Sequence, residues 1–189
     1  MDRPLVRKGE GVSLGIYQRE EIPRMYSDFA DSEVQRFLNR PDKLFYLEGE
    51  YEWYDALRKD ESSRVMAVLL NKEAGKGRQD GEHEFIGSVG IHGIDIISRN
   101  GELGYLLFRK YWGKGYATEA VSLGIDYAFQ TLNLRKLIAR VMEPNRASSA
   151  VLEKNGFVLA GRLTSHHYLR SYGYVDELYY ELHRDSMTD

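Results

Sequence analysis

The stretch that decides the fold runs from Tyr111 to Ala120 and reads YWGKGYATEA. Its glycines, Gly113 and Gly115, let the backbone approach a ligand closely. The stretch leads straight into a predicted helix, so several unpaired N–H groups and the positive end of the helix dipole point the same way. Such a helix start binds anions, and a pyrophosphate suits it. Lys114 adds a mobile positive charge.

Three kinds of phosphate-binding turn could account for this stretch. A Walker A loop needs G-x-x-x-x-G-K-[ST], which the sequence lacks. A dinucleotide fingerprint needs a third glycine in G-x-G-x-x-G, where this chain has Thr118. It also needs repeated βαβ units, and the sequence offers one clear unit. The third kind binds the pyrophosphate of coenzyme A. A plain helix start that binds nothing is the remaining alternative.

The residues around the glycine turn have regular apolar patterns. From Ala117 to Leu132 the apolar positions form one helical stripe about four turns long. Asn145 is a predicted N-cap of a second helix, which stops at Asn155-Gly156. Earlier helices are predicted over residues 22–29, 34–38 and 48–59. Strands are predicted over residues 12–17, 65–70, 85–94, 102–108, 136–142, 157–169 and 174–182.

This order predicts an α/β protein with a mixed sheet. It also predicts that residues 1–189 form a single domain. A first strand and helices are followed by a strand meander, a strand–helix–strand–helix unit and a final hairpin. The one clear break covers residues 72–84, which hold three glycines among charged residues and predict a flexible hairpin loop.

Composition excludes several classes of protein. The 189 residues carry a formal net charge of −3, which does not indicate a nucleic-acid partner. The absence of cysteine excludes disulfides, cysteine nucleophiles and thiolate metal sites, and no metal site is predicted. No apolar run approaches the roughly 20 residues that span a bilayer, so no membrane partner is expected. The N-terminus has no apolar signal-peptide core, and we expect a cytoplasmic protein.

Two blocks together resemble the GCN5-related N-acetyltransferase (GNAT) superfamily. Residues 112–117, WGKGYA, are similar to its signature Q/R-x-x-G-x-G/A, with Trp112 in place of Gln or Arg. Residues 145–157, NRASSAVLEKNGF, match the N-x-x-S…L-E-K-x-G-F of the branch that holds ribosomal-protein-alanine and spermidine N-acetyltransferases. Residues 101–105, GELGY, also match. The resemblance is strong over residues 85–180.

The resemblance implies a mostly antiparallel sheet with a central splayed parallel pair, flanked by helices. It also implies acetyl-CoA as co-substrate, with the pantetheine arm in the gap between the splayed strands. Backbone groups of Tyr105, Leu106 and Leu107 would line that arm, and an amide at Leu107 would polarise the thioester carbonyl. Asn145 would contact the pantetheine. The amides that would hold the pyrophosphate are those of Gly113, Lys114, Gly115, Tyr116, Ala117 and Thr118.

The implied reaction is direct attack of a neutral amine on the thioester. Glu102 and His167 are the candidate bases; a carboxylate can work through water, and an imidazole suits proton relay. Each could instead be only a surface or structural residue. Many relatives carry a tyrosine that protonates the thiolate, and this chain has Leu152 there. Ser148 matches the serine that serves the thiolate in the ribosomal-protein branch, or it helps to cap the helix.

The acceptor is expected to be a primary amine. A protein N-terminal α-amine has a reference pKa of about 7.7–8.0, so it demands less of a base than a lysine-type amine, whose reference pKa is about 10.4. It is favoured over a polyamine or another small amine. Acidic clusters could attract a polycation, or they are solvated helix faces: Asp28, Asp31 and Glu33, then Glu48, Glu50 and Glu52.

Other interpretations stay open. A non-catalytic acyl-CoA-binding sensor would explain the missing tyrosine, and a nucleotide-binding oxidoreductase would explain the two glycines alone. A homodimer through the terminal strands is also possible.

Overall fold

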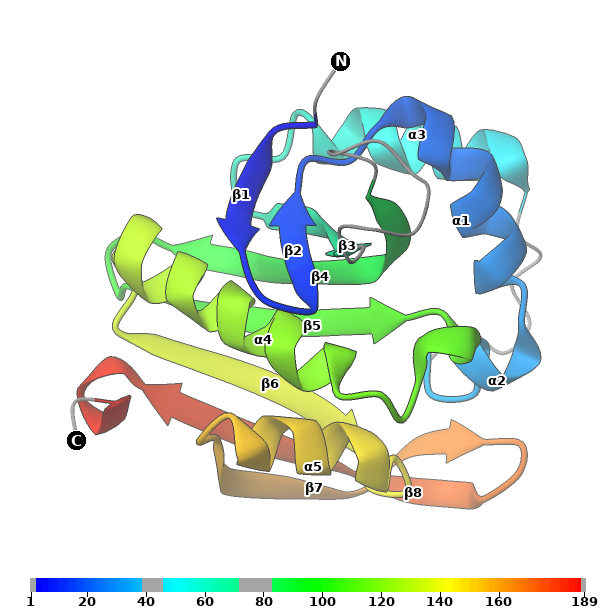
Figure 1. Cartoon of the computed structure of the whole chain (residues 1–189). Coiled ribbons are helices and arrows are strands. Elements are labelled where there is room, and N and C mark those ends of the chain that lie inside the picture. Colours follow the sequence, from blue (N-terminus) through cyan, green and yellow to red (C-terminus); the bar gives the residue numbers. More distant parts are fainter. Residues whose placement is uncertain (1–2, 39–45, 72–82, 188–189) are drawn as a thin grey trace.

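One eight-stranded sheet organises the part of the chain that the structure describes. The computed structural model describes residues 3–38, 46–71 and 83–187. The strand order is β1-β2-β3-β4-β5-β6-β8-β7, so β1 and β7 form the edges. In Figure 1, α4 and α5 lie together across the front of the sheet, and α1 and α3 lie together near its β2–β3 end. The predicted mixed sheet flanked by helices is therefore confirmed.

The elements follow each other in a simple order. The strands are β1 (Leu5–Lys8), β2 (Val12–Gly15), β3 (Arg64–Leu70), β4 (Glu84–Asp95), β5 (Asn100–Leu107), β6 (Lys136–Met142), β7 (Val158–Leu169) and β8 (Gly173–His183). The helices are η1 (Arg19–Glu21), α1 (Ile22–Phe29), α2 (Ser32–Gln35), α3 (Leu47–Leu57), η2 (Arg109–Tyr111), α4 (Tyr116–Asp126), η3 (Tyr127–Thr131), α5 (Arg146–Lys154) and η4 (Arg184–Met187).

The sheet opens between β5 and β6, its one parallel pair among the described strands. Their register covers three residue pairs and ends at Glu102 opposite Ile138. Beyond that point β5 stays paired with β4 as far as Leu107. Likewise β6 stays paired with β8 as far as Met142. The predicted splayed pair is confirmed, and it leaves backbone edges on both strands where a ligand can pair.

Alternation along the strands separates a core face from a polar face. Ala139, Val141 and Leu178 are buried in a cluster that also holds Leu152 of α5. Full burial of a side chain such as Leu152 contributes about 1.5–3 kcal/mol. Because successive strand residues point to opposite faces, the residues between these positions lie on the face away from α5. Arg140 is one of them.

Most predicted strands and helices match to within two residues at each end; the first predicted strand, for example, ends at Gly15. Three differences are larger. The strand β1 was not predicted. The predicted helix over residues 34–38 is instead the short α2, because Phe37 leaves the helix and stacks on Tyr172 with ring centroids 6.1 Å apart. The long helix after the glycines becomes a π-helix, η3, in its last turn.

The predicted loop over residues 72–84 also needs a correction. Glu84 already belongs to β4, where its strand pairing with β3 begins, and residues 72–82 lie outside the described residues. Among the described helices, none has the length and apolar character that crossing a bilayer requires.

Candidate active site

The glycine turn lies beyond the end of β5 and starts α4. Gly113 has a φ of 71° and Gly115 a φ of 84°, a left-handed conformation that other residues adopt only with strain. A Cβ added at either glycine would meet no atom within 4 Å. Gly115 is the N-cap of α4, whose first amides lack partners within the helix. The predicted cradle therefore has the open space and donors that a pyrophosphate needs.

Trp112 fastens this turn to the splayed strand. Its indole Nε1 donates a hydrogen bond to the carbonyl of Leu107 at 2.7 Å. Leu107 is the last residue of β5, so the bond joins the end of the strand to the residue before Gly113. The aromatic residue that replaces the usual Gln or Arg thus has a structural role in placing the turn.

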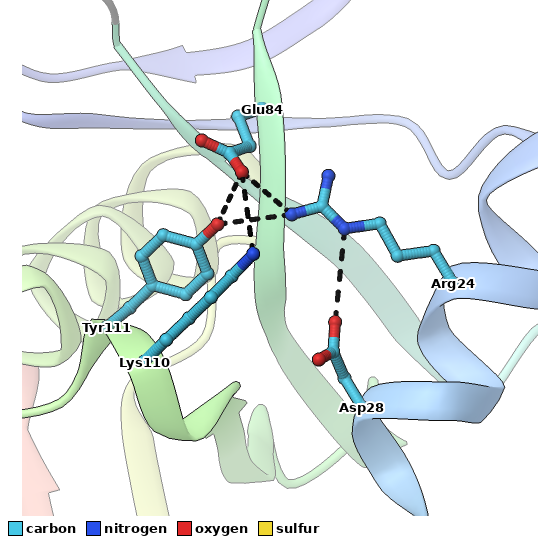
Figure 2. Close-up of polar contacts among 5 residues, drawn as sticks. All are labelled: Arg24, Asp28, Glu84, Lys110 and Tyr111. Atoms are coloured by element: carbon cyan, nitrogen blue, oxygen red, sulfur yellow. Dashed lines mark hydrogen bonds and ion pairs between the residues drawn. The ribbon is translucent and has the colours of Figure 1, made fainter.

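A group of charged and polar side chains holds the segment that leads into the turn (Figure 2). Oε1 of Glu84 on β4 accepts a hydrogen bond from the Tyr111 hydroxyl at 2.6 Å and from Arg24 Nη2 at 2.8 Å. Lys110 Nζ lies 3.7 Å from the same oxygen. Arg24, on α1, also reaches Asp28 with 3.9 Å between Nε and Oδ2. Because Lys110 and Tyr111 belong to η2, this group ties α1 and β4 to the segment just before Gly113.

Loss of the Glu84 charge is expected to destabilise the fold. Hydrogen bonds from Tyr111 and Arg24 hold the pKa of Glu84 below its ordinary value of 4.5, although partial burial opposes them. Glu84→Gln should lower the free energy of unfolding by about 1–2 kcal/mol at pH 7, since a hydrogen bond to a charged group contributes about 1.5–3 kcal/mol and partial exposure reduces it.

The pH dependence of this loss has a defined sign. A folded-state pKa below the unfolded value stabilises the protein above pH 4.5. That contribution disappears as the pH falls through the lowered folded-state pKa. Urea unfolding of wild type and Glu84→Gln should therefore differ at pH 7 and converge in strong acid. Glu61→Gln, at an exposed position, is the control and should match wild type. Equal stability of Glu84→Gln and wild type at pH 7 would refute the role of this group.

On the polar face of the sheet, the two candidate bases lie in one connected group. Glu102 Oε1 on β5 accepts a hydrogen bond from Arg140 Nε on β6 at 2.9 Å. Arg140 Nη1 lies 3.8 Å from Oε1 of Glu177 on β8. Nε2 of His167 on β7 lies 3.1 Å from the same oxygen. The structure thus links Glu102 to His167 through Arg140 and Glu177, neither of which was predicted as a site residue.

Glu177 is the buried member of this group, with 5% of its surface exposed. Burial acts to raise its pKa, but hydrogen bonds from His167 and Tyr179 and the charge of Arg140 outweigh it and bring the pKa below 4.5. Its carboxylate is therefore ionised at neutral pH. The ionised carboxylate lies 3.1 Å from Nε2 of His167, so the two side chains form a close pair on this face of the sheet.

Residues from both sides of the splay meet at the start of α5. Asn145 caps the helix, as predicted, because its Oδ1 accepts a hydrogen bond from the Ser148 amide at 3.3 Å. The Ser148 hydroxyl instead lies 2.8 Å from the hydroxyl of Tyr105, which also donates to the Ser148 carbonyl at 3.1 Å. Burial raises the pKa of Tyr105 to about 12, so this hydroxyl keeps its proton. Two hydroxyl groups thus connect β5 to α5.

The first acidic cluster is balanced by arginines. Asp31 Oδ2 lies 3.8 Å from Arg109 Nη1, while its Oδ1 caps α2. Glu33 pairs with Arg36 at 3.2 Å. A pocket of about 440 Å³ is lined by Asp28, Asp31, Arg109 and Lys110. Because two carboxylates face two cations there, the pocket offers little net charge to a polycation.

Two of the three residues that the sequence analysis missed, Arg140 and Glu177, share one signal. Arg140 on β6 and Glu177 on β8 stand at positions that alternate with the buried apolar residues of their strands. That pattern predicts that they face away from α5, but not that they meet. Glu84 gave no signal, because it was placed in the loop.

Comparison with known proteins agrees with this geometry. Residues 14–158 match the family model described as the acetyltransferase (GNAT) domain. The probable N-acetyltransferase YjcK of Bacillus subtilis (strain 168) is 32% identical over 151 residues, 76% of this chain and 77% of that protein. The uncharacterized N-acetyltransferase p20 of Bacillus licheniformis is 42% identical over 80 residues, which are 42% of this chain. The matched region covers 45% of the length of p20, so the chain spans about half of that relative.

A solved structure supports the same fold. It is the spermidine N-acetyltransferase from Vibrio cholerae in complex with CoA and spermine, with a TM-score of 0.81 at 20% sequence identity, over 94% of this chain and 98% of that one. The splayed sheet, the glycine turn and the matched family model agree, and the chain belongs to the GNAT acetyltransferase family.

Proposed function

We propose that the protein transfers an acetyl group from acetyl-CoA to a primary amine by direct attack of the amine on the thioester. The observation that carries the proposal is the splay of β5 from β6, which leads into the glycine turn at the start of α4. Membership of the GNAT family supports it. So does the CoA named with the spermidine N-acetyltransferase of the same fold.

Acetyl-CoA, when bound, would supply the activated carbonyl that the amine attacks. Tyr105, Leu106 and Leu107 lie in the part of β5 that has separated from β6, and their backbone groups would line the pantetheine arm. The Leu107 amide would polarise the thioester carbonyl, and Asn145 would contact the arm. The amides proposed to hold the pyrophosphate are those of Gly113, Lys114, Gly115, Tyr116, Ala117 and Thr118.

His167 is the proposed base that removes the proton from the acceptor amine. The ionised Glu177 carboxylate, 3.1 Å from its Nε2, would stabilise the imidazolium that forms. Glu102 is the second candidate base, and its hydrogen bond to Arg140 fixes its position. Either His167 or Glu102 can act as the general base for the amine. The proposed direct attack needs no covalent intermediate.

Ser148 is the proposed proton donor to the departing thiolate, with the Tyr105 hydroxyl behind it. Ser148→Ala should lower kcat about 10²-fold, the low end of the range for a proton-transfer group, while acetyl-CoA binding changes little. Steady-state kinetics with saturating amine measure this. Ser186→Ala, near the C-terminus and outside the proposed site, is the control. An unchanged kcat for Ser148→Ala would remove the serine from the reaction.

A protein N-terminal α-amine is the favoured acceptor. The carboxylates of the first acidic cluster are paired with cations, which weakens the case for a polyamine. An α-amine also asks less of the base, with a pKa of about 7.7–8.0. A polyamine or another small amine is the second acceptor class, in line with the spermine named with the solved structure.

The test is a panel of amines incubated with enzyme and acetyl-CoA, with acetylated products identified by mass spectrometry. Peptides with free N-termini, the same peptides with blocked N-termini, and spermidine separate the acceptor classes. Acetylation of the free peptides alone would support the favoured acceptor. Tight acetyl-CoA binding without any acetylated amine would favour the alternative, a non-catalytic acyl-CoA-binding sensor.

Three further expectations stay predictions: that residues 1–189 form a single domain, that the protein forms a homodimer through its terminal strands, and that it is cytoplasmic.

A further inference from the structure

Three metal-binding side chains gather where β7 meets β8. They are His166 and His167 of β7 and Glu177 of β8. One donor atom from each lies within 4.8 Å of the others. Nε2 of His167 is 3.1 Å from Oε1 of Glu177, and Nε2 of His166 is 3.7 Å from its Oε2. The cluster therefore offers two imidazoles and one carboxylate.

An irregularity in β7 brings the two histidines together. Successive residues of a strand point to opposite faces, so adjacent histidines would normally diverge. Here Ser165 has a φ of 50°, and the register with β8 shifts between Leu163 and His167. The Ser165 amide donates to Asp176 Oδ1 at 2.8 Å and holds the irregular turn in place. Such bulges re-aim side chains, and the two imidazole rings lie with centroids 4.7 Å apart.

A second observation concerns one oxygen of the Glu177 carboxylate, Oε2, and its surroundings. The residue is 5% exposed, and its Oε2 is buried without a hydrogen-bond partner among the described residues. That oxygen is the one nearest to His166. A buried carboxylate oxygen without a donor is costly unless a cation or a donor reaches it. Arg140 contacts the other oxygen, Oε1, and leaves Oε2 to the histidine side.

We propose that His166, His167 and Glu177 form a binding site for a divalent transition-metal ion of the zinc type. Imidazole nitrogen and carboxylate oxygen are ligands that zinc accepts. Zinc bonds of about 2.1 Å in a tetrahedron place neighbouring donors about 3.4 Å apart. The two histidine–glutamate separations run to different carboxylate oxygens. Nε2 of His167 lies 3.1 Å from Oε1 and Nε2 of His166 lies 3.7 Å from Oε2, and each distance is close to that spacing. Three protein ligands leave a fourth position for water.

The site also has a consequence for catalysis, which rests on the proposed function. With a metal on Nε2 of His167, the neutral ring carries its one proton on Nδ1, which then cannot accept the proton of the amine. An occupied site therefore removes His167 from proton transfer. Metal binding would then inhibit acetyl transfer. His166 is exposed and lies outside the proposed proton-transfer group, so its loss should abolish inhibition and leave the basal rate unchanged.

Calorimetric titration of the tag-free protein with zinc chloride, without acetyl-CoA, tests the site. Wild type should bind one ion per chain, and magnesium chloride should give no such binding. His166→Ala and Glu177→Gln should each weaken zinc binding more than about 10-fold, the least that even an outer-shell change costs. His183→Ala removes a partly exposed histidine that lies beside Glu181, and this variant should bind zinc like wild type.

Two results would overturn the proposal. One is no zinc binding by folded wild type, and the other is equal zinc affinity in wild type and His166→Ala. In the activity assay, zinc should inhibit wild type and His183→Ala but not His166→Ala; equal inhibition of all three would refute the inhibitory role. If no amine is acetylated by any form, the proposed function fails, while the calorimetry still decides the metal site.

Discussion

Gly115→Glu is expected to abolish acetyl-CoA binding. At a φ of 84° any side chain is strained by about 1–2 kcal/mol, and the glutamate would project into the open space at the start of α4. Its negative charge would stand where the pyrophosphate is proposed to bind and repel it. In thermal unfolding, acetyl-CoA at 100 times its Kd should stabilise wild type by about 2.7 kcal/mol and leave the variant unchanged.

The matched control is Gly173→Glu. Gly173 has a φ of 74°, and a Cβ added there would also meet no atom within 4 Å. It carries the same substitution and a similar backbone strain at the start of β8, away from α4. It should be destabilised like Gly115→Glu yet be stabilised by acetyl-CoA as wild type is. A full acetyl-CoA shift in Gly115→Glu would show that the cradle holds no pyrophosphate.

His167→Asn is expected to lower kcat by about 10²–10⁴-fold, the range for a general base. The KM for acetyl-CoA should stay near the wild-type value, because His167 lies on β7 and the cradle lies at α4. Glu177→Gln should lower kcat through the same imidazole, so the double variant should lose little more than His167→Asn alone. Initial rates over a range of acetyl-CoA concentrations, at saturating amine, give kcat and this KM for all three variants.

Two further variants make the result specific. His183→Asn changes a partly exposed histidine of β8 and should keep the wild-type kcat. Glu102→Gln tests the other candidate base. A wild-type kcat for His167→Asn together with a large loss in Glu102→Gln would contradict the assignment and make Glu102 the base.

The sequence predicted the central part of the fold because its signals are local. Glycines at 113 and 115, the apolar stripe of the following helix and the Asn145 cap each act over a few residues. The gap between β5 and β6 followed from the resemblance of two blocks, and the register confirms it. The short β1 escaped prediction because its four residues show no clear alternation of buried and exposed positions.

The polar groups could not be predicted because they are long-range. Glu102 and Glu177 are far apart in the sequence, and both contact Arg140 only because β6 lies between β5 and β8. The Glu84 group likewise joins α1, β4 and η2. The position of His166 beside His167 depends on a left-handed Ser165, which nothing in the local sequence demands.

The most direct test of the central claim is calorimetric titration of the wild-type protein with acetyl-CoA and, separately, with NAD. The proposed cradle and splayed strands predict saturable binding of one acetyl-CoA per chain and no binding of NAD. Absence of acetyl-CoA binding by the folded protein would contradict the claim and leave the glycine turn as a plain helix start.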